Sequence, residues 1–85
     1  MMEPDLMNFD KTWTRWHSDG WVLTVFRTPH GEYSYRSHRE GQADTAALPA
    51  KSLVDAQHRA EDIVRNSGHR CVARCSFWIA DPPDE

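Results

Sequence analysis

The sequence has little cysteine and no long apolar run, and each shortage excludes a class of protein. Two cysteines in 85 residues are too few for a disulfide framework. No apolar stretch approaches the roughly 20 residues that a membrane-spanning helix needs. The N-terminus lacks the basic and apolar regions of a secretion signal, because Glu3-Pro4-Asp5 interrupts it at once. We therefore expect a cytoplasmic protein that does not contact a membrane.

Motifs of common enzyme classes are also missing. The four glycines form neither a phosphate-binding loop nor a dinucleotide-binding fingerprint, and no metalloprotease motif occurs. Nucleophilic catalysis needs a nucleophile, a base and an orienting group in one pocket. The candidates are His17 near Asp19, the two cysteines as nucleophiles, and His58 near Glu61 and Asp62, and no spacing joins them in one site. The spacing of His58 from Glu61 and Asp62 is typical of a solvated helix face. We predict that the protein is not an enzyme and that it has no cofactor.

The net charge of −3 hides an uneven distribution of acids. Residues 1–10 carry three acids and no base, and residues 81–85 carry three more. Removing these six from thirteen acids leaves seven against ten bases, eight of them arginine, so the remainder is about +3. This surplus is far below that of a dedicated duplex-binding protein. We expect a flexible acidic arm at 1–10, one domain at 11–79 and a disordered acidic tail at 80–85.

The first half of the domain predicts an antiparallel meander. Its Asp19-Gly20 step is a strong hairpin signal, and residues 28–31 contain the proline and glycine of a second turn. Residues 39–50 are polar and rich in breakers, which predicts a linking loop. Three segments rich in aromatic, β-branched or alternating residues are predicted strands: 12–17, the weakest of the three in pattern, 21–27 and 32–38.

A helix is predicted from Ser52 to a stop at Gly68. The Ser52 hydroxyl can accept from amides of the first turn, and Asp55 completes a pair like a capping box. Glycine after the last turn can adopt the left-handed conformation that ends a helix. Apolar residues recur on one helical face: Leu53, Ala56, Ala60, Ile63 and Val64.

The segment 70–79 alternates and predicts a last strand. Its odd positions, from Cys71 to Ile79, are apolar and are assigned to the core beneath the helix, so Arg74 and Trp78 are assigned to the opposite face. The predicted fold class is α+β: a small antiparallel sheet in the order β-β-β-α-β with one helix packed on one face. The last strand is expected at an edge of the sheet or between other strands.

Both cysteines lie in this last strand, beside a histidine. His69, Cys71 and Cys75 form a candidate zinc site, with His58 or His38 as a fourth ligand. Zinc requires its ligands to converge on one ion, whereas four residues of extended chain span roughly 13 Å. The same distance rules out a disulfide within the strand. We expect both cysteines to be small core residues without a metal, and keep the zinc module as an alternative.

Aromatic residues are abundant, with four tryptophans and two tyrosines. One helix covers only one face of a sheet, so tryptophan, tyrosine and arginine on the other face can contact a partner. Hot spots of protein interfaces favour these residue types, and single-stranded nucleic acid is bound by the same combination. We predict a noncatalytic interaction module that binds a protein partner or a second copy of itself, with nucleic acid as the alternative. The predicted contact residues are Trp78, Arg74, Trp16, Arg36 and Tyr35.

Overall fold

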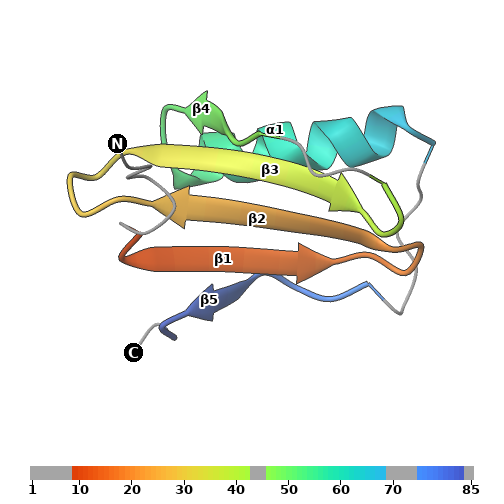
Figure 1. The fold of residues 1–85 in the computed structure, drawn as a ribbon, viewed down its shortest axis with the longest axis horizontal. Coiled ribbons are helices and arrows are strands. Elements are labelled where there is room, and N and C mark those ends of the chain that lie inside the picture. The colour runs from red at the N-terminus through yellow and green to blue at the C-terminus, as the bar shows by residue number, and fades with distance from the viewer. Residues whose placement is uncertain (1–8, 43–45, 69–74, 84–85) are drawn as a thin grey trace.

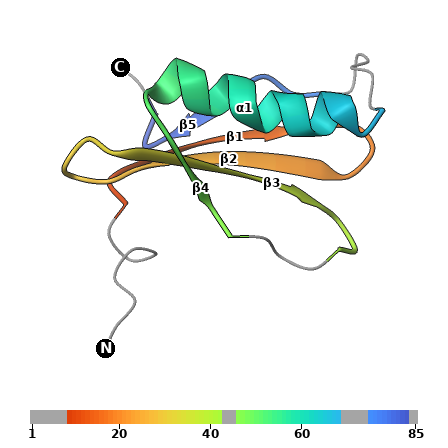
Figure 2. The same ribbon diagram turned by 90° about the horizontal axis from the view of Figure 1, so that it is seen from above.

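A computed structural model describes residues 9–42, 46–68 and 75–83 and shows a five-stranded antiparallel sheet covered on one face by one helix (Figures 1 and 2). The order across the sheet is β4-β3-β2-β1-β5. The predicted α+β fold is confirmed. The elements along the chain are β1 (Lys11–Trp16), β2 (Trp21–Arg27), β3 (Tyr33–Arg39), β4 (Leu48–Ala50), α1 (Leu53–Asn66) and β5 (Ile79–Asp81).

The meander of β1, β2 and β3 lies within one residue of its predicted bounds. Trp13 lies opposite Val25, which in turn lies opposite Tyr35. The two predicted turns contain glycines with positive φ, +95° at Gly20 and +85° at Gly31, a conformation that glycine adopts without steric cost. Local turn chemistry and β propensity thus suffice to place these three strands.

The predicted linking loop at 39–50 contains an additional strand, so that prediction was wrong at its C-terminal end. β4 pairs with the outer edge of β3, with Tyr33 opposite Ala50 and Tyr35 opposite Leu48. Its central residue, Pro49, has no N–H to donate, which suits an edge strand. Proline is also uncommon in strands, so the sequence does not indicate a strand here. Three residues around a proline are too short and irregular a pattern to predict a strand.

The helix begins where the sequence predicts. The Ser52 hydroxyl accepts from the Asp55 N–H at 3.1 Å, and the Asp55 carboxylate accepts from the Lys51 N–H at 2.9 Å, one residue earlier than in a standard capping box. At the other end the Gly68 N–H donates to the Arg65 carbonyl, with φ of +97° at the glycine. Both caps confirm the predicted ends.

Asp55 at this cap predicts a loss of stability in acid. Its pKa is lowered by the hydrogen bond from the Lys51 N–H and next by its pairing with Arg59. The unfolded chain therefore binds a proton at higher pH than the folded chain, and the free energy of unfolding falls as the pH drops through the folded pKa. We expect Asp55→Asn to weaken the acid sensitivity that urea unfolding measures between about pH 6 and about pH 3. Asp62→Asn, at an exposed pair on the same helix, is the control, and an equal acid-induced loss in Asp55→Asn and wild type would contradict the prediction.

The core lies between the helix and one face of the sheet. Small helix residues at spacing four, Ala56, Ala60 and Val64, are buried and allow the helix to approach the strands closely. Of the other residues predicted on this helix face, Leu53 packs at the margin of the core and Ile63 is 37% exposed. The sheet contributes five buried side chains: Trp13, Trp21, Leu23, Val25 and Tyr35. Trp13 and Trp21 thus lie on the helix side of the sheet.

A buried hydrogen bond also fixes the helix to the sheet. Ser37, on β3, is 7% exposed, and its hydroxyl donates to the Ala60 carbonyl at 2.8 Å.

In the part of the chain that the structure describes, no helix is long and apolar enough to span a membrane.

The last strand is shorter than predicted, and its faces are reversed. Residues 75–78 are not in a strand, and β5 pairs with β1 so that Ala80 lies opposite Trp13 on the helix side. Trp78 and Ala80 accordingly pack against the core, whereas Phe77 is 86% exposed. The assignment of odd positions to the core was therefore wrong for residues 77 and 79. The pairing with β1 sets the face, and a shift by one residue exchanges the two faces.

Candidate functional site

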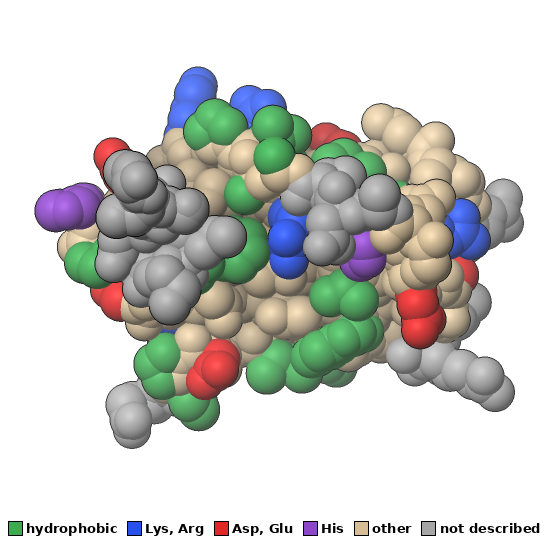
Figure 3. Space-filling view, in the orientation of Figure 1, with side chains coloured by type: hydrophobic (Ala, Val, Ile, Leu, Met, Phe, Trp, Pro, Cys, Tyr) green, Lys and Arg blue, Asp and Glu red, His purple; other side chains and the backbone are tan. Residues whose placement is uncertain are grey.

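The sheet face opposite the helix is mostly polar at its centre. The strand register places Thr14, Thr24 and Arg36 side by side there. Figure 3 shows this face, with few hydrophobic side chains in the middle and a group of them along the lower side. The open face is formed by alternate residues of three strands: Thr12, Thr14, Trp16, Val22, Thr24, Phe26, Ser34, Arg36 and His38.

Phe26 also lies on this face, opposite Thr12 and Ser34, and its ring is covered. Phe9 stacks on it with ring centroids 4.4 Å apart, and the Arg36 guanidinium lies 5.8 Å from its centroid. Phe26 is consequently only 8% exposed. Phe9 thus packs on the sheet. These contacts leave no open aromatic plane for stacking at this position.

A different group of apolar side chains is exposed at the β5 edge of the sheet. Phe77 is 86% exposed, Ile79 51% and Trp16 47%. Ile79 of β5 lies opposite Thr14 of β1, and Phe77 precedes β5 by two positions. The Ser76 N–H donates to the Trp16 carbonyl at 2.8 Å and the Trp16 N–H to the Ser76 hydroxyl at 2.9 Å, which holds this segment beside β1. We call these three residues the edge patch; Figure 3 shows hydrophobic side chains where β1 and β5 lie in Figure 1.

The predicted contact residues are not brought together. Trp16 and Arg36 lie on the open face as expected, but Tyr35 is in the core and 7% exposed. Trp78 packs against the core from the helix side, which corrects its assignment to the open face. Arg74 lies outside the described residues. Phe77 and Ile79 were missed because their apolar character was attributed to burial.

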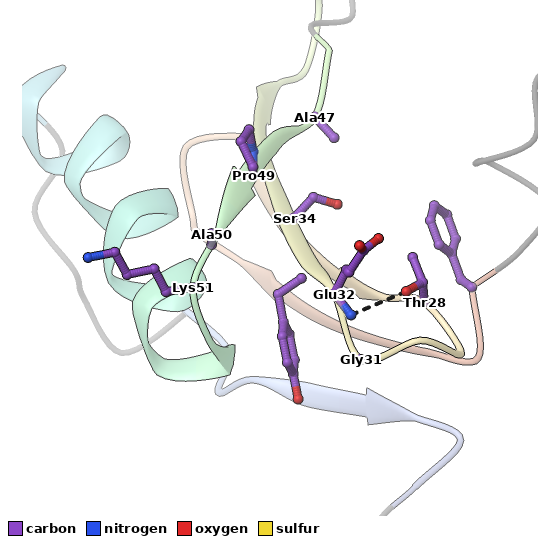
Figure 4. A pocket seen from close by; sticks show the side chains of 10 residues that line it. Thr28, Gly31, Glu32, Ser34, Ala47, Pro49, Ala50 and Lys51 are labelled. Atoms are coloured by element: carbon purple, nitrogen blue, oxygen red, sulfur yellow. Dashed lines mark hydrogen bonds between the residues drawn. The ribbon is translucent and has the colours of Figure 1, made fainter.

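A recess with a volume of about 660 Å³ lies between β4 and the turn after β2 (Figure 4). Two of its lining residues are hydrogen-bonded to each other, because the Glu32 N–H donates to the Thr28 hydroxyl at 3.2 Å. Lys51 extends away from the other labelled side chains. This recess therefore brings no set of catalytic groups together.

A second cluster joins three elements on the helix side of the sheet. The Cys75 sulfur lies 3.2 Å from Nδ1 of His17, and Nε2 of His17 lies 3.2 Å from Oε1 of Glu61 on α1. Oε2 of Glu61 accepts from Nη1 of Arg15 at 2.5 Å. The side chain of His17 is fully buried, whereas Glu61 and Arg15 are 16% and 23% exposed. We call Cys75, His17, Glu61 and Arg15 the thiol cluster.

The cluster has the connectivity of a thiol, a base and an orienting carboxylate. A smaller recess of about 510 Å³ is lined by His17, His38 and Glu40 among others, but Cys75 lines neither this recess nor the larger one. Cys75 is a partly buried residue. The arrangement can therefore change the reactivity of one thiol, but these recesses do not enclose a substrate against it.

Sequence reasoning missed this cluster because its members are far apart along the chain. His17 lies 58 positions from Cys75 and 44 from Glu61. The sequence instead paired His17 with Asp19, and Glu61 with His58. No local spacing contains the information that the end of β1 meets the middle of α1.

Of the three candidate zinc ligands, the structure describes Cys75. His69 and Cys71 lie outside the described residues, and among the residues that are described no three potential ligands are arranged to hold a metal ion. Cys75 is described, but it does not lie in a straight strand, so the distance argument from an extended chain does not apply to residues 75–78. The zinc module thus stays an alternative to the expected core cysteines.

The chain matches no protein-family model, no curated protein and no solved structure.

Proposed function

We propose that the protein is a noncatalytic, cytoplasmic interaction module that associates with a second copy of itself through the edge patch. The observation that carries the proposal is the exposure of Phe77, Ile79 and Trp16 at one corner of the sheet. Single exposed apolar residues are ordinary, but a cluster at a sheet edge is typical of an interaction surface. A chain of 85 residues also gains stability from association more readily than a large domain does.

The two edges of the sheet differ in a way that favours β5. An edge strand presents unpaired backbone groups, and proteins block unwanted pairing with proline or charge. β4 carries Pro49 at its centre, whereas β5 consists of Ile79, Ala80 and Asp81, with its one charge at its last residue and proline only after its end. The described edge at β5 is thus the one with consecutive N–H groups next to exposed apolar side chains.

Pairing of two β5 strands also agrees with symmetry. A twofold axis places identical surfaces against each other, which is the commonest arrangement of homodimers. Two β5 strands related by such an axis run antiparallel, so the antiparallel order of the sheet continues into the second copy. The same axis brings the edge patch of one copy to that of the other.

We expect sedimentation velocity to show a monomer–dimer equilibrium between about 1 and 100 μM, and Phe77→Ser to raise the dissociation constant at least about tenfold. Phe77 is exposed, so this change removes interface contacts without removing core contacts. Val54→Ser is the matched control, because Val54 is 59% exposed on the helix, away from the edge patch.

A wild-type chain that stays monomeric at the upper end of this range would overturn self-association. Equal weakening by Phe77→Ser and Val54→Ser would show that the chain associates through another surface. Circular dichroism of each variant establishes that the fold is retained.

A further inference from the structure

We propose that Cys75 is a reactive thiol that forms a mixed disulfide with low-molecular-weight disulfides, with His17 as its base and Glu61 and Arg15 as positioning residues. The inference goes beyond self-association and does not depend on it. It rests on the continuous contacts from sulfur to imidazole to carboxylate to guanidinium in the thiol cluster.

The partners of His17 determine which nitrogen faces the sulfur as a base. An ionised carboxylate only accepts hydrogen bonds, so Nε2–H of His17 donates to Glu61. In the neutral imidazole the second nitrogen, Nδ1, is then without a proton and faces the Cys75 sulfur at 3.2 Å. This is the tautomer that takes the proton of a thiol, and the resulting imidazolium stabilises the thiolate.

Backbone contacts hold the two reacting residues in place. The His17 N–H donates to the Trp21 carbonyl at 2.9 Å, at the closed end of the first hairpin. Next to Cys75, the Ser76 carbonyl accepts from Nε of Arg15 at 2.8 Å while the Ser76 N–H donates to the Trp16 carbonyl. Arg15 therefore contacts both sides of the cluster, through Glu61 and through Ser76. A sulfur held in this way keeps its base within hydrogen-bond distance.

The partial burial of Cys75 restricts the electrophile to a small molecule. Thiol–disulfide exchange fits, because the reaction is complete with one protein thiol and needs no second cysteine. In the step itself, the Cys75 thiolate attacks one sulfur of the disulfide and forms a new S–S bond. The original S–S bond breaks, and the departing thiolate receives the proton that His17 took from Cys75. One small thiol leaves, and the other half of the disulfide stays on the protein.

Several charged and titratable groups surround His17. Glu61 contacts it from α1, with Arg15 of β1 behind the carboxylate. His38 of β3 and Glu40, which follows β3, line the same recess as His17. We therefore base the test on comparison of variants across a pH series rather than on a single value.

The chain offers a direct way to follow Cys75 separately from Cys71. Trypsin cleaves after Arg70 and Arg74, so the two cysteines fall on different peptides, 71–74 and 75–85. We would incubate the reduced full chain with glutathione disulfide across a pH series, quench with acid, and measure the glutathione adduct on each peptide by mass spectrometry. The chain unfolded in urea provides the rate of an ordinary thiol at the same sequence position.

At about pH 6, we expect Cys75 in the folded chain to react about tenfold faster than in the unfolded chain, since a histidine partner raises the thiolate fraction more than it lowers nucleophilicity. His17→Gln is expected to abolish this advantage and to make the rate rise with pH as in the unfolded chain. His58→Gln, on the exposed face of α1, makes the same chemical change away from the thiol cluster and is expected to keep the wild-type rate.

If His17→Gln does not fold, Glu61→Gln decides the question, because it keeps an acceptor for Nε2 but removes the charge that favours imidazolium. We expect a several-fold slower reaction at about pH 6 in that variant. The proposal is overturned if folded and unfolded wild type react at the same rate, or if a folded His17→Gln or Glu61→Gln reacts like wild type. It is also overturned if a chelator is needed before Cys75 reacts, which would make the sulfur a metal ligand.

Discussion

Leu23→Ala is expected to lower the free energy of unfolding by about 3 kcal/mol and the melting temperature by about 15 °C. Leu23 is fully buried at the centre of β2, and its neighbours in the core come from both the sheet and the helix. Truncation removes the transfer free energy of its methyl groups and leaves a cavity that rigid neighbours fill only in part. A small domain has a total stability of about 5–15 kcal/mol, so the loss is a large fraction.

Thermal and urea unfolding followed by circular dichroism measure this effect. Val54→Ala is the control, because Val54 is 59% exposed and its truncation is expected to change stability by less than about 0.5 kcal/mol. A loss below about 1 kcal/mol for Leu23→Ala would show that the space around β2 is not closely packed.

Glu61→Ala is expected to lower the free energy of unfolding by about 2 kcal/mol, which is the second large effect. The change leaves two polar groups without their shared acceptor, namely Nε2 of His17, whose side chain is fully buried, and the guanidinium of Arg15. The cost is below the roughly 3–5 kcal/mol of a fully buried ion pair, because water reaches part of Arg15 and Glu61.

The matched control is Asp62→Ala, one position further along the helix. It breaks an ion pair with Arg65 in which the two side chains are 64% and 61% exposed, so we expect a change below about 0.5 kcal/mol. Urea unfolding of both variants gives the comparison. Equal losses would mean that the burial of His17 and the contacts of Glu61 do not affect stability.

The α+β fold followed largely from local signals. Asp19-Gly20 predicts a hairpin because glycine can adopt the positive φ that its turn contains, and Ser52 predicts a helix start because its hydroxyl can accept from the first turn. These effects depend on residues a few positions apart, so the sequence shows them directly. β4 escaped prediction because its pairing comes from β3 rather than from its own three residues.

The face of the last strand needed the tertiary structure. The alternation around Phe77 shows that two faces exist, but it does not say which one is inward. Pairing of Ala80 with Trp13 decides this, and it exposes Phe77 and Ile79 while burying part of Trp78. The candidate interaction surface is therefore the edge patch, and it does not include the predicted Tyr35 and Trp78.

The sequence by itself determined that the chain forms a small antiparallel meander with one helix, and where that helix begins and ends, because those features depend on propensity, turns and caps. Only the tertiary structure decided which apolar residues are exposed and which polar ones meet. Cys75, His17 and Glu61 have no sequence spacing in common. They meet because the segment before β5 lies beside β1, and because α1, which packs over β2 and β3, places Glu61 within hydrogen-bond distance of Arg15 and His17. Such long-range pairing depends on the register of the whole sheet.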